Sequence, residues 1–240
     1  MNKIKTIPSS TTLSDQMVKA IRRDILLGRF LPGDKLQMNE LKQYYQVGGT
    51  PIREALVQLV WQHFVVMEPQ KGFRVAPISL DELRDILTTR RAIAGIALEK
   101  AMQRGDEEWE LSIITAFHRM ERIQLDQPDV DYEEWGERHI AFHIALIQAC
   151  NSPMMLSTLE SIYNQLERYR HIWLNGDLDQ VTRYHDHGEH KVIMDAVLAR
   201  DLQLSLQLIE EHYQHVIDLA ESLSPENFSE RVKLHQRLKA

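Results

Sequence analysis

Residues 47–62, Val-Gly-Gly-Thr-Pro-Ile-Arg-Glu-Ala-Leu-Val-Gln-Leu-Val-Trp-Gln, decide the fold of the first part of the chain. The two glycines break any preceding helix, and Thr50 is a candidate N-cap for a new one. Pro51 suits the first helical position, because its missing N–H has no partner there. The buried face predicted for this helix is formed by Ala55, Leu56, Leu59 and Val60, which fall on one side. The stretch therefore predicts a turn followed by a helix over 51–62.

The flanking segments extend this to three helices and a two-stranded ribbon. Upstream, the pattern predicts a helix over 13–27, capped by Thr12 or Ser14, and a short helix over 38–45. Downstream, apolar runs predict strands over 64–67 and 73–75, joined by a tight turn at 69–72. This order is typical of a winged helix-turn-helix. We assign residues 11–77 to this DNA-binding domain and residues 1–10 to a flexible arm.

Several side chains of this domain are candidates for DNA contact. The second helix of a helix-turn-helix enters the major groove N-terminus first, which places Thr50, Pro51 and Arg53 nearest the bases. Arg53 can fork onto guanine or pair with phosphate. At the wing tip, Lys71 can neutralise phosphate, and Gly72 lets the backbone approach closely. The alternative is that Arg53 and Lys71 are ordinary solvated charges.

The charge distribution favours DNA as a partner of the first domain. Residues 1–78 hold 11 Lys and Arg against 6 Asp and Glu, whereas the rest of the chain holds 17 against 29. A basic segment within a chain of net charge −7 is a hint of nucleic-acid contact. The single cysteine and the lack of a long apolar run favour a cytoplasmic protein without a membrane partner.

Beyond residue 78 the pattern becomes entirely helical. Ser79 to Glu82 form a capping-box start. Six helices are expected, over 80–104, 107–126, 131–150, 153–174, 179–199 and 202–222. We assign 78–223 to an all-α bundle for sensing and dimerisation, and 224–240 to a polar tail. The predicted fold class is mainly α: a three-helix, two-strand winged head and a C-terminal helical bundle.

Eleven histidines are many for this length, and four have a suggestive spacing. His139 and His143 share a helix face at i and i+4, while His190 and His212 fall on two later helices. Three helices of a bundle can bring four imidazoles to one transition metal. The alternative is a coincidental surface pair. His185 and His187 lie close to His190 in sequence and are not expected to be ligands, and the other five histidines have no partner spacing.

Segments 28–36, 50–56 and 72–75, with sequences GRFLPGDKL, TPIREAL and GFRV, resemble the GntR family of transcription regulators. The resemblance implies that DNA faces the positions of Asn39, Gly49, Thr50, Arg53, Lys71 and Gly72. The family usually has Arg in place of Gly49 and often Arg in place of Asn39. The operator sequence that family members recognise therefore cannot be transferred to this chain.

The helical part resembles the FCD-type ligand-binding domain of the FadR subfamily. The segments that carry this are Ala141–His143, Glu189–Ile193, Ala196–Asp201 and Glu211–His212. The resemblance implies a metal held by His139, His143, His190 and His212, with zinc expected first and nickel as the alternative. The family usually has Asp in place of His139, so this site carries one negative charge fewer, or His139 does not bind.

The resemblance also implies an effector acid. Arg90 matches an inward arginine that holds an effector carboxylate; without the resemblance, an ion pair with Asp85 on the helix surface is the better interpretation. The family tends to have Glu in place of Ala94. The segment 168–174 is most similar to a branch of carbon-starvation-induced repressors of glutarate and 4-aminobutyrate catabolism. It suggests a small dicarboxylate, with Arg168 or Arg170 as extra anion contacts.

We therefore expect a homodimeric transcription regulator and not an enzyme. It would be a repressor released from operator DNA by a small carboxylic acid. Two alternatives stay open. One is a metal-dependent hydrolase. The sequence shows no nucleophile motif, and a hydrolase would not explain the basic first domain. The other is a helical adaptor whose histidines only pack.

Overall fold

The structure is a computed structural model that describes residues 12–123, 132–174 and 188–222. The chain divides into two compact units between Ala76 and Pro77. The expected arm over 1–10 and the expected tail over 224–240 lie outside the described residues. In the part of the chain that is described, no helix is both long and apolar enough to cross a bilayer.

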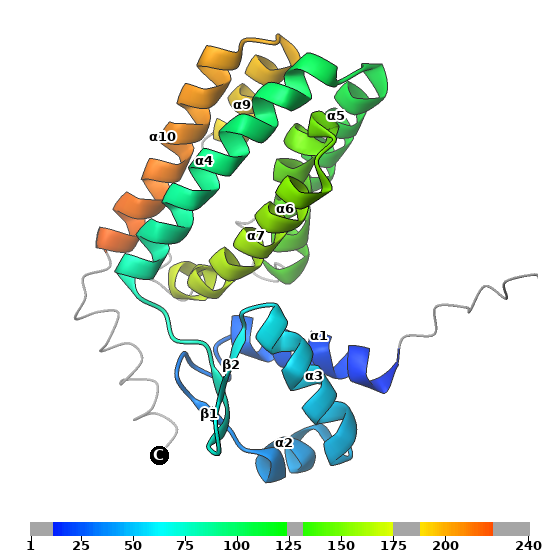
Figure 1. Ribbon diagram of the computed structural model, residues 1–240, viewed down its shortest axis with the longest axis vertical. Coiled ribbons are helices and arrows are strands. Elements are labelled where there is room, and N and C mark those ends of the chain that lie inside the picture. The colour runs from blue at the N-terminus through cyan, green and yellow to red at the C-terminus, as the bar shows by residue number, and fades with distance from the viewer. Residues whose placement is uncertain (1–11, 124–131, 175–187, 223–240) are drawn as a thin grey trace, which may run out of the picture. The chain divides into compact units, whose positions relative to one another are not determined.

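The first unit combines three helices with a small sheet (Figure 1). The helices are α1 (Leu13–Leu26), α2 (Met38–Tyr45) and α3 (Gly49–Trp61), and the strands are β1 (Lys35–Leu36), β2 (Val65–Glu68) and β3 (Gly72–Val75). Helix α1 packs against α3. Their shared core includes Ile21, Ile52 and Leu56, which are fully buried. This packing leaves the opposite side of α3 to solvent.

The starts of α1 and α3 are built differently. Thr12 caps α1 in a capping box: its hydroxyl accepts from the Asp15 N–H at 3.1 Å, and the Asp15 carboxylate accepts from the Thr12 N–H at 3.0 Å. Helix α3 begins at Gly49, with Gly48 as an N-cap that offers no side-chain hydrogen bond. The prediction of Thr50 as N-cap is therefore wrong. Proline is tolerated anywhere in the first turn, where N–H groups have no helical partner, so Pro51 does not fix the first residue.

The wing is part of a three-stranded antiparallel sheet of order β1-β3-β2. Val65 pairs with Val75 and Met67 with Phe73, while Lys35 pairs with Arg74 on the other edge of β3. The sequence predicted two strands; β1 was missed because two residues are too few to show alternation. Gly72 adopts a φ of +93° at the end of the turn, a conformation that side chains disfavour.

The second unit is a bundle of helices. They are α4 (Leu80–Arg104), α5 (Glu107–Glu121), α6 (Tyr132–Ile147), a 3₁₀ turn η1 (Gln148–Cys150), α7 (Pro153–Leu174), α9 (Glu189–Leu198) and α10 (Leu202–Ser222). Helix α4 packs against α6, α7 and α10, and α9 packs against α10 (Figure 1). This arrangement turns one face of α6, α9 and α10 towards a common interior.

The helix bounds of this unit follow the sequence signals closely. Helices α4, α7 and α10 have the predicted bounds, and Ser79 caps α4 by accepting from the Glu82 N–H at 3.1 Å. Between α6 and α7, Asn151 adopts the left-handed conformation, with a φ of +53°, so the chain stops and restarts there. Helix α5 ends at Glu121, before the predicted 126. The predicted helix over 179–199 is described only from Glu189 onwards.

Candidate metal centre and DNA-contact surface

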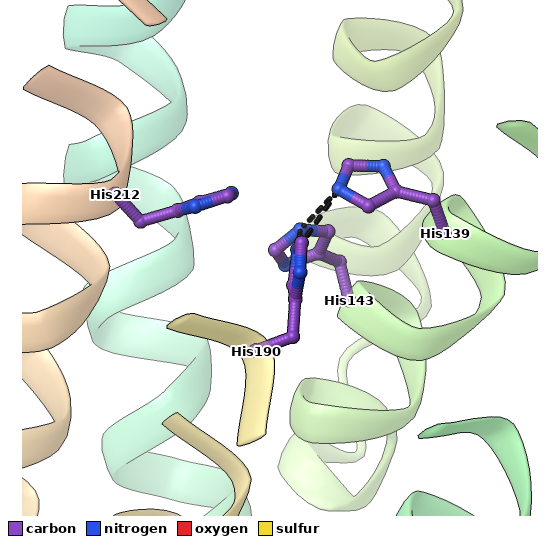
Figure 2. A group of neighbouring side chains, drawn as sticks. All are labelled: His139, His143, His190 and His212. Carbon is purple, nitrogen blue, oxygen red and sulfur yellow. Dashed lines mark hydrogen bonds between the residues drawn. The ribbon is translucent and has the colours of Figure 1, made fainter. Parts of the chain in front are cut away.

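Four histidines from three helices meet inside the second unit. His139 and His143 lie one turn apart on α6, His190 lies near the start of α9, and His212 lies in α10 (Figure 2). All four are buried. One ring nitrogen of each falls within 4.8 Å of those of the other three. The structure thus brings together the four histidines that the sequence singled out, while metal binding itself stays a prediction.

The ring nitrogens are spaced as ligands of a single ion would be. The Nε2 atom of His139 lies 3.0 Å from that of His190 and 3.1 Å from that of His143, and the last two are 3.3 Å apart. Ligands bound to one zinc at about 2.0–2.1 Å are themselves about 2.8–3.0 Å apart at octahedral angles and about 3.3–3.4 Å apart at tetrahedral angles. A neutral imidazole has one N–H and one lone pair. If one of the three Nε2 atoms carries the hydrogen, the other two present lone pairs that face each other. A cation can accept the lone pairs of all three Nε2 atoms.

Burial favours the neutral form of two of the four rings, those of His143 and His212. The pKa of His143 lies well below its usual value, first because of burial and then because of the neighbouring His139. Burial also lowers the pKa of His212 to about 4, although its hydrogen bond with Glu189 acts in the opposite direction. Histidine binds a metal through its neutral imidazole ring and not through the protonated imidazolium. At neutral pH these two rings are therefore neutral and available.

Aromatic side chains enclose the cluster. Trp135 stacks on His139 with 4.8 Å between ring centroids, and Tyr163 of α7 stacks on His143 at 5.8 Å. On the α10 side, His212 contacts a carboxylate: its Nδ1 lies 2.8 Å from Oε2 of Glu189. The same carboxylate contacts His215. Glu189 brings a negative charge to the edge of the cluster.

Arg90 is an interior residue next to this cluster. It is 3% exposed, and its guanidinium carbon lies 4.5 Å from the ring centroid of Tyr163 and 4.0 Å from that of Tyr213. Its charge contributes to the lowered pKa values of His143 and His212. The interpretation of Arg90 as a helix-surface residue paired with Asp85 is wrong, because Arg90 is buried. A buried guanidinium beside a candidate metal centre is suited to an anionic group.

Arg168 has a different environment. Its guanidinium donates to the Pro77 carbonyl at 2.9 Å and pairs with Glu82 at 2.8 Å. The hydroxyl of the adjacent Tyr169 contacts Glu82 and donates to the Ser79 carbonyl at 3.2 Å. These contacts hold the residues through which the chain enters the helical bundle. The side chain of Arg170 lies outside the described residues.

The residues expected to contact DNA lie on the surface of the first unit. The side chains of Asn39, Thr50, Arg53 and Lys71 are exposed, as is Gly72, while Gly49 and Pro51 are half-buried. Gly49, Thr50 and Arg53 line a groove that also includes residues at the start of α1. The residues on the opposite side of α3, including Ala55 and Leu59, are fully buried. DNA contact by each of these residues stays a prediction.

Sequence reasoning missed four neighbours of the histidine cluster: Trp135, Tyr163, Glu189 and Tyr213. Two of them directly adjoin a histidine of the cluster in sequence, so helix geometry placed them close to it. Tyr163 comes from a different helix and carries no sequence signal of its own. His185 and His187, which are close to His190 in sequence and are not expected to be ligands, lie outside the described residues.

Comparison with known proteins matches both units. Residues 13–75 match the family model "Bacterial regulatory proteins, gntR family", and residues 85–215 match the FCD domain. The HTH-type transcriptional repressor GlaR of Escherichia coli K12 is 36% identical over 80% of this chain and 88% of its own length. The HTH-type transcriptional regulator BphR of Paraburkholderia xenovorans LB400 is 34% identical over 89% and 87%.

Solved structures show the same fold at lower sequence identity. McbR/YncC of Escherichia coli superposes with a TM-score of 0.69 at 18% identity, over 89% of this chain and 99% of that one. A putative GntR regulator from Rhodococcus sp. RHA1 gives a TM-score of 0.67 at 20% identity, over 85% and 95%.

Proposed function

The chain belongs to the GntR family of bacterial regulatory proteins and carries an FCD domain, and on this basis we propose a metal-containing repressor released from its operator by a small carboxylic acid. It is a DNA-binding regulator of transcription with a C-terminal effector-binding domain. Repression is proposed from the relative GlaR, a repressor by name. A regulator of transcription works at the chromosome, so we place its action in the cytoplasm.

The observation that carries the metal proposal is the buried triangle of Nε2 atoms at 3.0–3.3 Å, with His212 beside it. Neutral imidazoles suit zinc, nickel, copper and iron. We propose zinc, with nickel as the alternative. The metal would be held by His139, His143, His190 and His212, and it would supply a Lewis-acidic centre that attracts a carboxylate.

The effector proposal rests on charge. The four imidazoles are neutral ligands, so a bound divalent ion keeps both of its positive charges, and Arg90 adds a third close by. A carboxylate would neutralise part of this charge, with the guanidinium as a bidentate donor. A small mono- or dicarboxylate is the class we propose. Arg168 as a second effector contact also stays a prediction, since its observed contacts are with Pro77 and Glu82.

The regulator would act as a homodimer, because a two-fold protein reads a palindromic operator with two equivalent recognition helices. Effector binding changes DNA affinity only if the acid binds one state of the dimer better than the other. A metal-dependent hydrolase is less well supported. The relatives GlaR and BphR are named as regulators of transcription.

The test begins with full-length protein and a library of random duplex DNA, from which the bound sequences are selected. Fluorescence anisotropy then measures affinity for the selected duplex while mono- and dicarboxylates are titrated in. We expect a palindromic sequence and a release of DNA by at least one carboxylate. Selection of no sequence would contradict the DNA-binding assignment. A selected operator whose affinity no carboxylate changes would contradict the effector class alone.

A further inference from the structure

Glu189 joins two histidines of α10 to the beginning of α9. Its Oε2 atom lies 2.8 Å from Nδ1 of His212 and its Oε1 atom 2.5 Å from Nδ1 of His215. The His212 side chain is 7% exposed and that of His215 is 64% exposed. The carboxylate therefore lies between the buried cluster and the surface. It also immediately precedes His190, another member of the cluster.

The chemistry of this contact determines which nitrogen of His212 faces the cluster. An ionised carboxylate only accepts hydrogen bonds, and Oε2 of Glu189 lies 2.8 Å from Nδ1 of His212. Nδ1 of His212 is therefore the N–H donor. The neutral ring then carries its lone pair on Nε2. A ring held in this tautomer and orientation is ready to bind a metal without rearrangement.

Glu189 also fixes one ligand-bearing helix to another. Helix α9 begins at Glu189, after Gly188 in a left-handed conformation with a φ of +90°. Gly188 provides no side-chain cap for the helix. The bonds to His212 and His215, which are three residues apart on α10, therefore tie the first turn of α9 to α10. His190, which follows Glu189, and His212 are held in register by the same carboxylate.

We propose that Glu189 is a positioning residue for the metal centre, setting the tautomer and orientation of His212 and the spacing of His190 and His212. This inference rests on the proposed metal site. Carboxylates that accept from a ligating histidine orient the ring and raise its basicity, and their loss costs about 10–100-fold in metal affinity. Glu189→Ala should weaken metal binding by about that factor. Glu189→Gln, which keeps an acceptor oxygen but loses the charge, should have an intermediate effect.

The experiment is a zinc titration of the full-length protein against a chromophoric chelator. The matched control is Glu211→Ala, because Glu211 adjoins His212 in sequence but its side chain is exposed and contacts Gln207. Circular dichroism of the metal-free proteins checks that each variant folds. Nitrogen-15 spectra of histidine-labelled protein report the tautomer of His212, which general destabilisation would not change selectively.

The expected results are weaker zinc binding in Glu189→Ala, partial rescue in Glu189→Gln and wild-type affinity in Glu211→Ala. The Nδ1-protonated signal of His212 should be lost or mixed in Glu189→Ala. Wild-type zinc affinity or an unchanged tautomer in Glu189→Ala would overturn the role of Glu189 and leave the metal site intact. A wild-type protein that binds no zinc and no nickel would overturn the metal site, and this inference with it.

Discussion

The guanidinium carbon of Arg90 lies 4.0 Å from the ring centroid of Tyr213, the residue that directly follows His212. A second ring, that of Tyr163, lies 4.5 Å from the same carbon and stacks on His143. One buried cation is thus held between two tyrosines, each of which contacts a histidine of the cluster. This position ties the proposed effector contact to the proposed metal centre.

Replacing Arg90 should therefore impair the response to the effector more than DNA binding. Arg90→Met keeps an unbranched apolar stem but removes a charge-assisted contact worth about 1.5–3 kcal/mol, or roughly 10–100-fold in effector affinity. Isothermal titration with the releasing carboxylate measures this. The control is Arg91→Met, since Arg91 is exposed and pairs with Glu210. Equal effector affinity in wild type and Arg90→Met would remove Arg90 from the effector site.

Replacing Arg53 should weaken operator binding. Arg53 is exposed in the first turns of α3, so Arg53→Ala should cost about 1–3 kcal/mol if the side chain reads a base, and should relax specificity at one position. Anisotropy with the selected duplex and with single-base variants measures both effects. Arg84→Ala, an exposed arginine of α4, is the control. Unchanged affinity over a range of salt concentrations would exclude Arg53 from the interface.

His139 stands where the family usually has Asp, and its substitution tests whether it is a ligand. Its Nε2 atom is part of the triangle with His143 and His190, so His139→Ala should lower zinc affinity, whereas His139→Asp should retain a metal because carboxylate oxygen is also a zinc ligand. Chelator competition compares the two variants. If His139→Ala bound zinc as tightly as wild type, the site would consist of three histidines.

Arg168 is expected to matter for stability. Arg168→Leu removes the ion pair with Glu82 and the hydrogen bond to the Pro77 carbonyl. Removing hydrogen bonds to a charged group should cost about 1.5–3 kcal/mol of unfolding free energy, reduced because the Glu82 side chain is 38% exposed. Urea denaturation measures the change. Wild-type stability combined with lost effector affinity would assign Arg168 to the effector site instead.

Most helix boundaries could be predicted from the sequence, because the signals that start and stop a helix are local. Thr12, Ser79 and the turn at Asn151 each fix a boundary through their own hydrogen bonds or backbone conformation. Where these local signals are weaker, the predicted element bounds are wrong. Proline at position 51 is compatible with several first-turn positions, so the start of α3 was placed too late. Strand β1 exists because Lys35 and Leu36 pair with β3, a non-local contact.

The candidate site could be predicted only in part for the same reason. The i, i+4 spacing of His139 and His143 is visible in sequence, and the resemblance supplied the two partners on later helices. The position of Tyr163 depends on how α7 packs beside α4 and α6, which no local pattern contains. The neighbours of Arg168 could not be predicted either. The resemblance suggested an effector anion as its contact, whereas its observed contacts are with Pro77 and Glu82, which are far away in sequence.

The metal content of the full-length protein, purified without added metal or chelator, tests the central claim most directly. Elemental mass spectrometry should find about one zinc or nickel ion per chain in the wild type and much less in His143→Ala, which removes one corner of the Nε2 triangle. A wild-type protein that contains no transition metal, and takes up neither zinc nor nickel on incubation, would contradict the account.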